Sequence, residues 1–264
     1  MISGFESLSP AIIVWVVVVI AVSGYVYGLL GLGLPLIATP LFVMVMPVRD
    51  AFVLILLPCL AAIAISIASV PDLRGALRRF WYMPIMSLIG AGVGAQLFVR
   101  APHLPYSLLL VTVMLAWAWL DWRGRSESPW MQRSPATAGV CFGLLAGITE
   151  ATANVAAPPL LIYYTGLGMA PGAMIQAMNL SFAPGKLTQL VTLLTIGGVP
   201  LVQWLATLPL VALASATQLV GIRARNRVDA ATYRRWLRWL VVAMAVVILI
   251  QVLMHMELGG STVQ

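Results

Sequence analysis

Two stretches of this sequence decide its fold: GYVYGLLGLGLPLIATPL at residues 24–41 and GLLAGITEATANVAAPP at residues 143–159. They lie inside the apolar segments 10–48 and 135–168. Each segment is too long for one helical crossing of a membrane, which needs about 20 residues, and glycine and proline interrupt it near the middle. Interrupted apolar segments at corresponding positions indicate the binding site of a transporter.

The two stretches align with each other without a gap at a shift of 119 residues. The matches are Gly24 with Gly143, Gly28 with Gly147, Ala38 with Ala157, Pro40 with Pro159, and Leu41 with Leu160. In each half of the chain a broken segment is followed by three uninterrupted apolar spans. This order indicates an internal repeat.

The composition supports a membrane protein. Of 264 residues, 61% are hydrophobic and 9% are charged, whereas a soluble domain has about 45–50% apolar and about 25% charged residues. The six uninterrupted spans are 51–70, 81–100, 104–121, 170–195, 200–221 and 236–256. We predict an all-α integral membrane protein with a first repeat at 1–122, a cytoplasmic linker at 123–134 and a second repeat at 135–264.

Basic residues orient the two repeats. Of 15 Lys and Arg residues, most lie in 71–80, 123–133 and 222–235, between apolar spans. Such stretches indicate cytoplasmic loops that contact lipid headgroups, rather than a nucleic-acid interface. The loop after the first uninterrupted span is basic in the first half, but its counterpart at 196–200 has no Lys or Arg. Equivalent loops therefore face opposite sides, which predicts inverted repeats.

The count of crossings then constrains the broken segments. If the three basic stretches are cytoplasmic, segment 10–48 begins and ends outside, and segment 135–168 begins and ends inside. Each is then a helical hairpin rather than a crossing, and both chain termini lie outside. The alternative, eight single crossings, would put either 71–80 or 222–235 on the wrong side of the membrane.

Polar residues at the breaks are the candidate substrate-binding residues. Lys186, the only lysine, lies within an apolar span, and an intramembrane charge indicates a functional site by default. Its alternatives are an ion pair with Glu150 or snorkelling toward the headgroups. Backbone N–H groups near 149–154 are expected to bind an anion. The full candidate set is Gly31, Gly33, Thr39, Thr149, Glu150, Thr152, Asn154, Gln176, Asn179, Lys186 and Gln189.

Glu150 is also the candidate for carrying a coupling proton, because burial removes the solvation of its charged form. We expect no enzyme, cofactor or metal, because the sequence has no Cys/His cluster, no nucleophile–base pair and no HExxH pattern. Cys59 and Cys141 lie in apolar runs and are interpreted as small core residues.

The glycine-rich opening, Gly24 to Pro40, resembles the start of the TauE/SafE sulfite-exporter family, also called toluene sulfonate uptake permeases. The segment Gly143 to Pro159 is similar to the second-half motif of that family, and 179–189 is similar to a further segment of its members. The resemblance covers nearly the whole chain. It implies transport of sulfur-containing anions such as sulfite, sulfonates or sulfoacetate, in a bacterial plasma membrane.

We therefore expect a secondary transporter for a small sulfonate-like anion, working by alternating access and coupled to protons. An anion channel, or a transporter of a non-sulfur carboxylate in either direction, is the alternative. The expected partners are the anionic substrate and membrane lipid but no nucleic acid, and a homo-oligomer stays open.

Overall fold

The computed structural model describes residues 9–70, 73–100, 106–124, 127–195 and 199–260, which form helices and no strands. The first half contains α1 (Pro10–Leu30), α2 (Leu34–Val43), α3 (Val48–Ala68), α4 (Leu73–Phe80), α5 (Tyr82–Arg100) and α6 (Tyr106–Trp122). The short α7 (Pro129–Arg133) follows. The second half contains α8 (Pro135–Ala153), α9 (Ala157–Gly166), α10 (Pro171–Thr195), α11 (Leu201–Ala206), α12 (Leu208–Arg225) and α13 (Ala230–Gly260).

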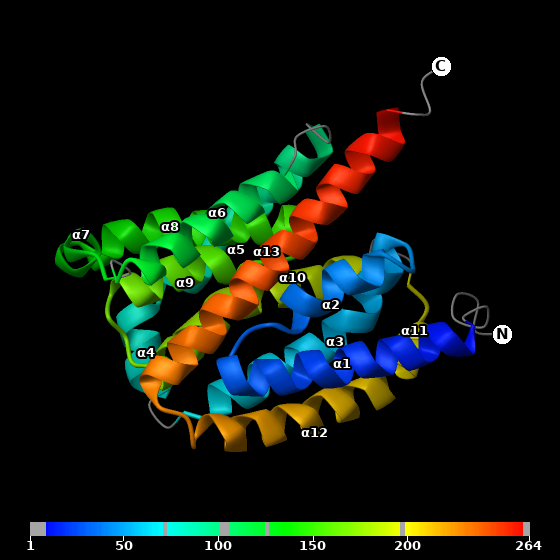
Figure 1. Ribbon diagram of the computed structural model, residues 1–264, viewed down its shortest axis with the longest axis horizontal. Coiled ribbons are helices and arrows are strands. Elements are labelled where there is room, and N and C mark those ends of the chain that lie inside the picture. The colour runs from blue at the N-terminus through cyan, green and yellow to red at the C-terminus, as the bar shows by residue number, and fades with distance from the viewer. Residues whose placement is uncertain (1–8, 71–72, 101–105, 125–126, 196–198, 261–264) are drawn as a thin grey trace.

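Five of the described helices are long and apolar enough to cross a membrane, or six if α4 and α5, which meet at 58°, form one bent span. The helices pack side by side along the long axis of the molecule (Figure 1). Large apolar side chains remain exposed on their outer faces, as on Val14, Leu201 and Trp239. The predicted all-α multi-pass membrane fold is thereby confirmed.

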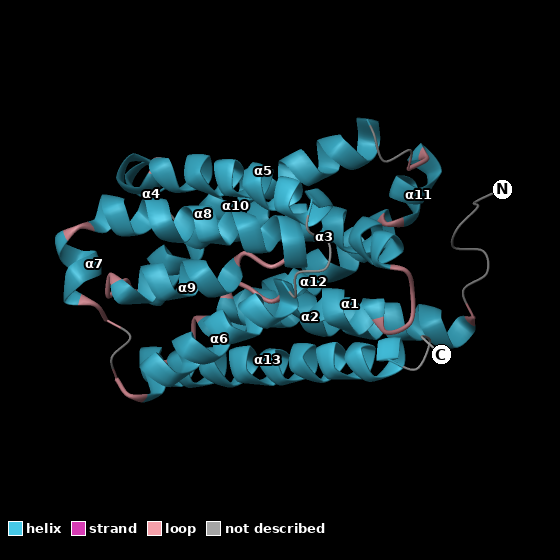
Figure 2. Cartoon of the chain, turned by 90° about the horizontal axis from the view of Figure 1, so that it is seen from above, coloured by secondary structure: helices cyan, strands magenta, loops and turns pink. Residues whose placement is uncertain are grey.

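Each predicted broken segment consists of two helices joined by a non-helical break. Gly31 (φ 76°) and Gly33 (φ 133°) form the break between α1 and α2, and Asn154 (φ 58°) ends α8. These left-handed conformations suit glycine and asparagine. In Figures 1 and 2, α2 and α9 run back beside α1 and α8, so both ends of each segment lie at one end of the molecule. This course supports the hairpin interpretation.

Three predicted loops differ from the structure. The stretch 71–80 is mostly helix α4, whose Leu73, Leu77 and Phe80 recur at helical spacing among its arginines. In 222–235, α12 extends to Arg225 and α13 begins at Ala230, which leaves only a short turn. The linker 123–134 contains α7. High local charge marked these stretches as exposed, but it does not prevent a helix.

Asp229 is the reason that α13 begins so early. Its Oδ1 accepts hydrogen bonds from the backbone N–H groups of Ala231 and Thr232, each at 2.9 Å, and its Oδ2 accepts from the Thr232 hydroxyl at 2.8 Å. Bonds of this kind satisfy N–H groups at a helix start. The bonds from the backbone and side chain of Thr232 hold the pKa of Asp229 below its usual value.

The two halves pack crosswise through glycines. Helix α1 of the first half packs on α12 of the second, and α8 packs on α5. A Cβ on Gly221 would collide with the carbonyl oxygen of Tyr25, and one on Gly90 would collide with that of Leu144. Tyr25 and Leu144 are separated by the same 119 residues as the aligned glycines. The two helix pairs therefore use equivalent contacts, as expected of repeats.

A larger residue at these glycines should destabilise the protein. A Cβ on Gly147 would overlap the carbonyl oxygen of Ser87, whereas one on Gly92 has nothing within 4 Å. We expect Gly147→Ala to lower the free energy of unfolding by about 1–3 kcal/mol, the usual cost of overpacking. Gly92→Ala is the control and should be neutral or slightly stabilising. Thermal unfolding of the purified protein measures both, and equal midpoints for the two variants would contradict the close packing.

The membrane orientation can be tested at both ends of the chain. Gly4 and Ser261 lie outside the described residues, but α1 begins and α13 ends at the same end of the molecule (Figures 1 and 2). We expect Gly4→Cys and Ser261→Cys to react with an impermeant thiol reagent added outside intact cells. Reaction of either only after the cytoplasmic face is opened would sink the hairpin topology.

Candidate functional site

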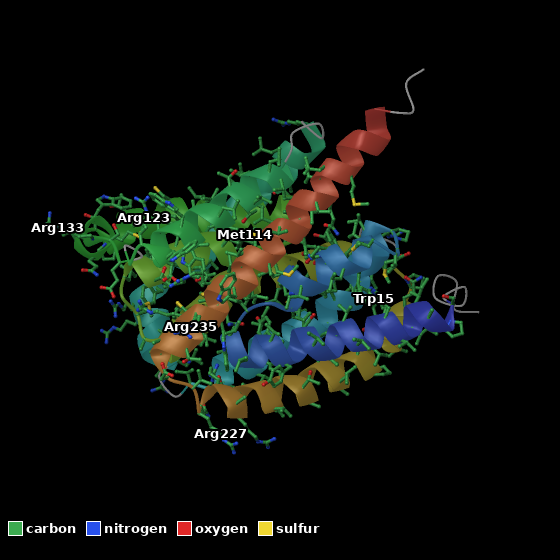
Figure 3. The ribbon with its side chains drawn as sticks, viewed as in Figure 1. Trp15, Met114, Arg123, Arg133, Arg227 and Arg235 are labelled. Carbon is green, nitrogen blue, oxygen red and sulfur yellow. The ribbon has the colours of Figure 1, made fainter. Side chains whose placement is uncertain are left out.

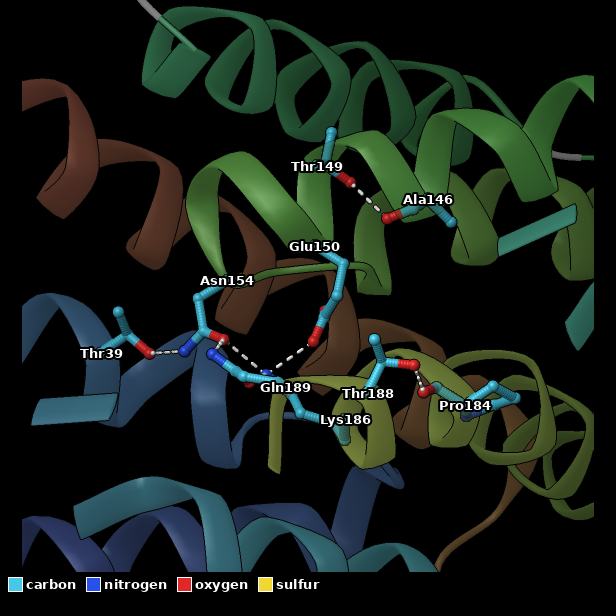
Figure 4. Close-up of polar contacts among 9 residues, drawn as sticks. All are labelled: Thr39, Ala146, Thr149, Glu150, Asn154, Pro184, Lys186, Thr188 and Gln189. Carbon is cyan, nitrogen blue, oxygen red and sulfur yellow. Dashed lines mark hydrogen bonds and ion pairs between the residues drawn. The ribbon is translucent and has the colours of Figure 1, made fainter. Parts of the chain in front are cut away.

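A buried ion pair lies where the second broken segment meets α10. The Nζ atom of Lys186 is 2.6 Å from Oε1 of Glu150, and the two side chains are 1% and 8% exposed. Glu150 belongs to the last turn of α8 and Lys186 to the middle of α10 (Figure 4). The two intramembrane charges that the sequence singled out therefore neutralise each other.

Asn154 connects this ion pair to the first hairpin. Its Oδ1 accepts a hydrogen bond from Nζ of Lys186 at 2.5 Å, and its Nδ2 donates to the Thr39 hydroxyl of α2 at 3.0 Å. Gln189 joins the same group, because its Oε1 accepts from Lys186 at 3.2 Å. We call Thr39, Glu150, Asn154, Lys186 and Gln189 the central cluster (Figure 4).

The backbone end of α8 explains why a cation lies here. The left-handed Asn154 ends the helix, and the last turn of a helix carries partial negative charge. Lys186 contacts side chains of this turn and of its cap. A lysine at this position is stabilised both by the Glu150 carboxylate and by the helix end.

The expectation that backbone N–H groups near 149–154 would bind an anion is wrong. The N–H of Asn154 donates to the carbonyl of Glu150 at 2.9 Å, and the N–H of Val155 donates to that of Thr149 at 3.4 Å. The stretch is the carboxyl end of a helix, where carbonyl groups rather than N–H groups are exposed. The helix starts near the breaks are those of α2 and α9, and neither has a side-chain cap.

Other candidate residues serve the helices themselves. The hydroxyls of Thr149 and Thr152 donate to carbonyls of their own helix, Ala146 at 3.1 Å and Ile148 at 2.8 Å. Gly31 and Gly33 form the first break and add no side chain. These four residues therefore shape the helices at the two breaks, and among the described residues none of their side chains bonds to the central cluster.

Asn179 and Gln176 lie on the predicted face of α10 but bind other partners. Asn179 Nδ2 donates to the Gly31 carbonyl at 3.1 Å, and its Oδ1 accepts from the Tyr27 hydroxyl at 2.5 Å. Gln176 Nε2 donates to the carbonyls of Ile67 at 3.1 Å and Val70 at 2.9 Å, at the end of α3. These amides hold helix ends in place rather than joining the central cluster.

The sequence did not indicate this supporting role for several other residues. The Tyr233 hydroxyl donates to the Leu30 carbonyl at 2.7 Å, and Gln251 Nε2 donates to the Pro40 carbonyl at 2.7 Å. Both side chains belong to α13 and bind the first broken segment, and Tyr27 within that segment donates to Asn179 of α10. Their residue types could have indicated this role, because a buried tyrosine or glutamine in an apolar span needs a polar partner.

A cavity of about 160 Å³ borders the central cluster at Thr39. Its lining extends from Val43 and Val48, beside the turn between α2 and α3, to Thr39 and Thr152. In the part of the chain that the structure describes, no group of three or more His, Cys, Asp or Glu side chains could hold a metal ion. The central cluster itself offers one ion pair and several hydrogen-bonding side chains.

Apolar helices that break around a buried ion pair define a membrane transport protein. Residues 16–248 match the family model described as "Sulfite exporter TauE/SafE", and the chain belongs to this family of membrane anion transporters. The resemblance noted in the sequence is thereby confirmed. Comparison with curated proteins gave no match, and neither did comparison with solved structures.

Removing one partner of the buried ion pair should strongly destabilise the protein. We expect Lys186→Met to cost about 3–5 kcal/mol, because it leaves the Glu150 carboxylate buried without a counter-charge. Combining Lys186→Met with Glu150→Gln should recover part of that loss. Thermal unfolding of the three variants measures the coupling.

The exposed pair of Arg234 and Glu127 provides the control. Its atoms are 3.9 Å apart, with side chains 40% and 55% exposed. Neutralising either partner should change stability by only about 0–1 kcal/mol. A loss for Lys186→Met no larger than that for Arg234→Met would mean that the central ion pair does not stabilise the fold.

Proposed function

We propose that the protein is a secondary transporter that moves a small sulfur-containing organic anion, such as a sulfonate, sulfoacetate or a sulfite-like ion. It works by alternating access in the bacterial inner membrane and is coupled to protons. The observation that carries the proposal is the ion pair of Lys186 and Glu150, buried at the break of a membrane segment. Such charges are costly in a membrane and mark substrate or ion pathways.

Lys186 has no donor to spare while Glu150 is ionised. An ammonium group has three N–H donors, and Lys186 contacts Glu150, Asn154 and Gln189. A substrate anion must therefore replace one of these partners. Replacing Glu150 is the favoured exchange, because one negative charge then takes the place of another beside the lysine.

Proton uptake by Glu150 keeps the net charge of the central cluster unchanged during this exchange. When Glu150 binds a proton, it loses the charge that holds Lys186, and a substrate anion can take its position. The cluster then has the same net charge as before. Anion and proton enter together, which is the basis of coupled transport in this proposal.

The surrounding structure supports a small substrate. The cavity beside Thr39 and Thr152 has about 160 Å³, below the roughly 300 Å³ at which drug-sized pockets begin.

One end of the molecule, which we call the basic end, carries Arg123, Arg133, Arg227 and Arg235 (Figure 3). By the positive-inside rule the basic end faces the cytoplasm. Lipid surrounds the exposed apolar faces, and a homo-oligomer is compatible with this arrangement.

Transport by variants reconstituted in proteoliposomes tests the mechanism. Glu150→Gln should abolish anion accumulation driven by a proton gradient but retain anion exchange, because a neutral residue imitates the protonated state. Lys186→Ala should abolish both activities, because the charge that binds the anion is lost. Radiolabelled ethanesulfonate and sulfite are suitable probes.

Glu127→Gln is the matched control, since it makes the same chemical change at an exposed site. Unchanged accumulation in both Glu150→Gln and Lys186→Ala would remove the central cluster from the mechanism. Flux that stays ohmic and insensitive to the proton gradient would instead identify an anion channel.

A further inference from the structure

A second cavity lies at the basic end, away from the central cluster. It has a volume of about 390 Å³. It lies between the end of α3, the start of α10 and the turn from α12 to α13. Its lining consists of Ser69, Val70, Pro171, Gly172, Arg225, Asn226, Val228, Ala230 and Tyr233. The proposed mechanism uses none of these residues.

Among the described residues of this lining, Arg225 is the one charged side chain. Its Nη2 is 3.5 Å from the Ser69 hydroxyl, and its Nη1 is buried with no hydrogen-bond partner among the described residues. By contrast, Arg238 pairs with Asp121 at 2.6 Å and Arg234 with Glu127 at 3.9 Å. A buried polar atom without a partner is rare and calls for an explanation. Here a bound anion would provide the partner.

The backbone beside Arg225 also suits an anion. Helix α10 starts at Pro171, and a Cβ built on Gly172 would meet nothing within 4 Å. The start of this helix is therefore open to the cavity and carries partial positive charge. The nearby carboxylate of Asp229 is occupied by the N–H groups at the start of α13. Positive groups thus dominate the described part of the lining.

The cavity is connected to the first broken segment through Tyr233. Tyr233 is one of the lining residues, and its hydroxyl donates to the Leu30 carbonyl at 2.7 Å, at the end of α1. Val70, another lining residue, accepts from Gln176 of α10. One residue of the lining therefore binds the helix end that borders the first break.

We propose that this cavity is a second binding site for small sulfonate- or sulfite-like oxyanions, with the Arg225 guanidinium as its main ligand. It is the vestibule through which the anion passes between the cytoplasm and Lys186. The role in transport rests on the proposed function above, whereas anion binding at Arg225 does not. Guanidinium groups match the geometry of oxyanions, which an ammonium does less well.

Side-specific transport tests the vestibule. In inside-out vesicles, which expose the basic end, Arg225→Gln should raise the apparent KM for ethanesulfonate about tenfold, since a charge-assisted hydrogen bond is lost. In right-side-out vesicles KM should not change. Arg225→Lys should give an intermediate value. Arg227→Gln removes the same charge from an exposed position nearby and is the control. If Arg225→Gln and Arg227→Gln changed this KM equally, the proposal that the cavity is a vestibule would be overturned.

Direct binding separates this inference from the proposed function. Ethanesulfonate should still raise the thermal unfolding temperature of Lys186→Ala, but not that of Lys186→Ala combined with Arg225→Gln. Asp72 follows the lining residue Val70 but lies outside the described residues, so Asp72→Asn is tested in parallel and should retain the effect. Arg225-dependent binding by a wild-type protein that transports neither ethanesulfonate nor sulfite would reject the transport proposal alone. Absence of any stabilisation of Lys186→Ala by ethanesulfonate, sulfite or acetate would overturn the second site.

Discussion

Backbone carbonyl groups freed where a helix breaks inside a membrane are the constraint on which this structure depends, because no water is there to bind them. Side chains from distant helices bind these groups around the first break. The pairs at the break are Tyr233 with Leu30 and Asn179 with Gly31, and Gln251 binds Pro40 in the last turn of α2. All three donors belong to the second half of the chain. The first broken segment is therefore completed only when the halves pack together, which the glycine contacts allow.

At the second break, a charged side chain compensates the carbonyl groups that the helix leaves free. Asn154 caps α8, and the ammonium of Lys186 compensates both the helix end and the Glu150 carboxylate. Tyrosine and amide donors hold the first break permanently, whereas an ion pair can exchange one anionic partner for another. This difference supports our proposal that the transport chemistry lies mainly in the second half of the chain.

The sequence predicted the membrane class and the two broken segments, and it offered a pairing of Glu150 with Lys186 as one alternative, because each depends on composition or on costly residues within apolar spans. It did not predict the partners of Asn179 or the role of Tyr233, because such contacts join residues far apart and leave no local pattern. It also treated 71–80 as a loop, although α4 occupies most of it. The direction of the backbone at 149–154 was missed because a helix end cannot be located from glycine and proline alone.

The saturation of Lys186 by its neighbours also bears on energetics. If a monovalent anion and a proton enter together, the core of the carrier is neutral both when it is empty and when it is loaded. Reorientation then moves no net charge across the bilayer, so the membrane voltage, worth about 2.3 kcal/mol per charge at 100 mV, does no work on the cycle. Only the concentration gradients of the anion and the proton would set its direction. The same protein could then load or clear its substrate as those gradients change.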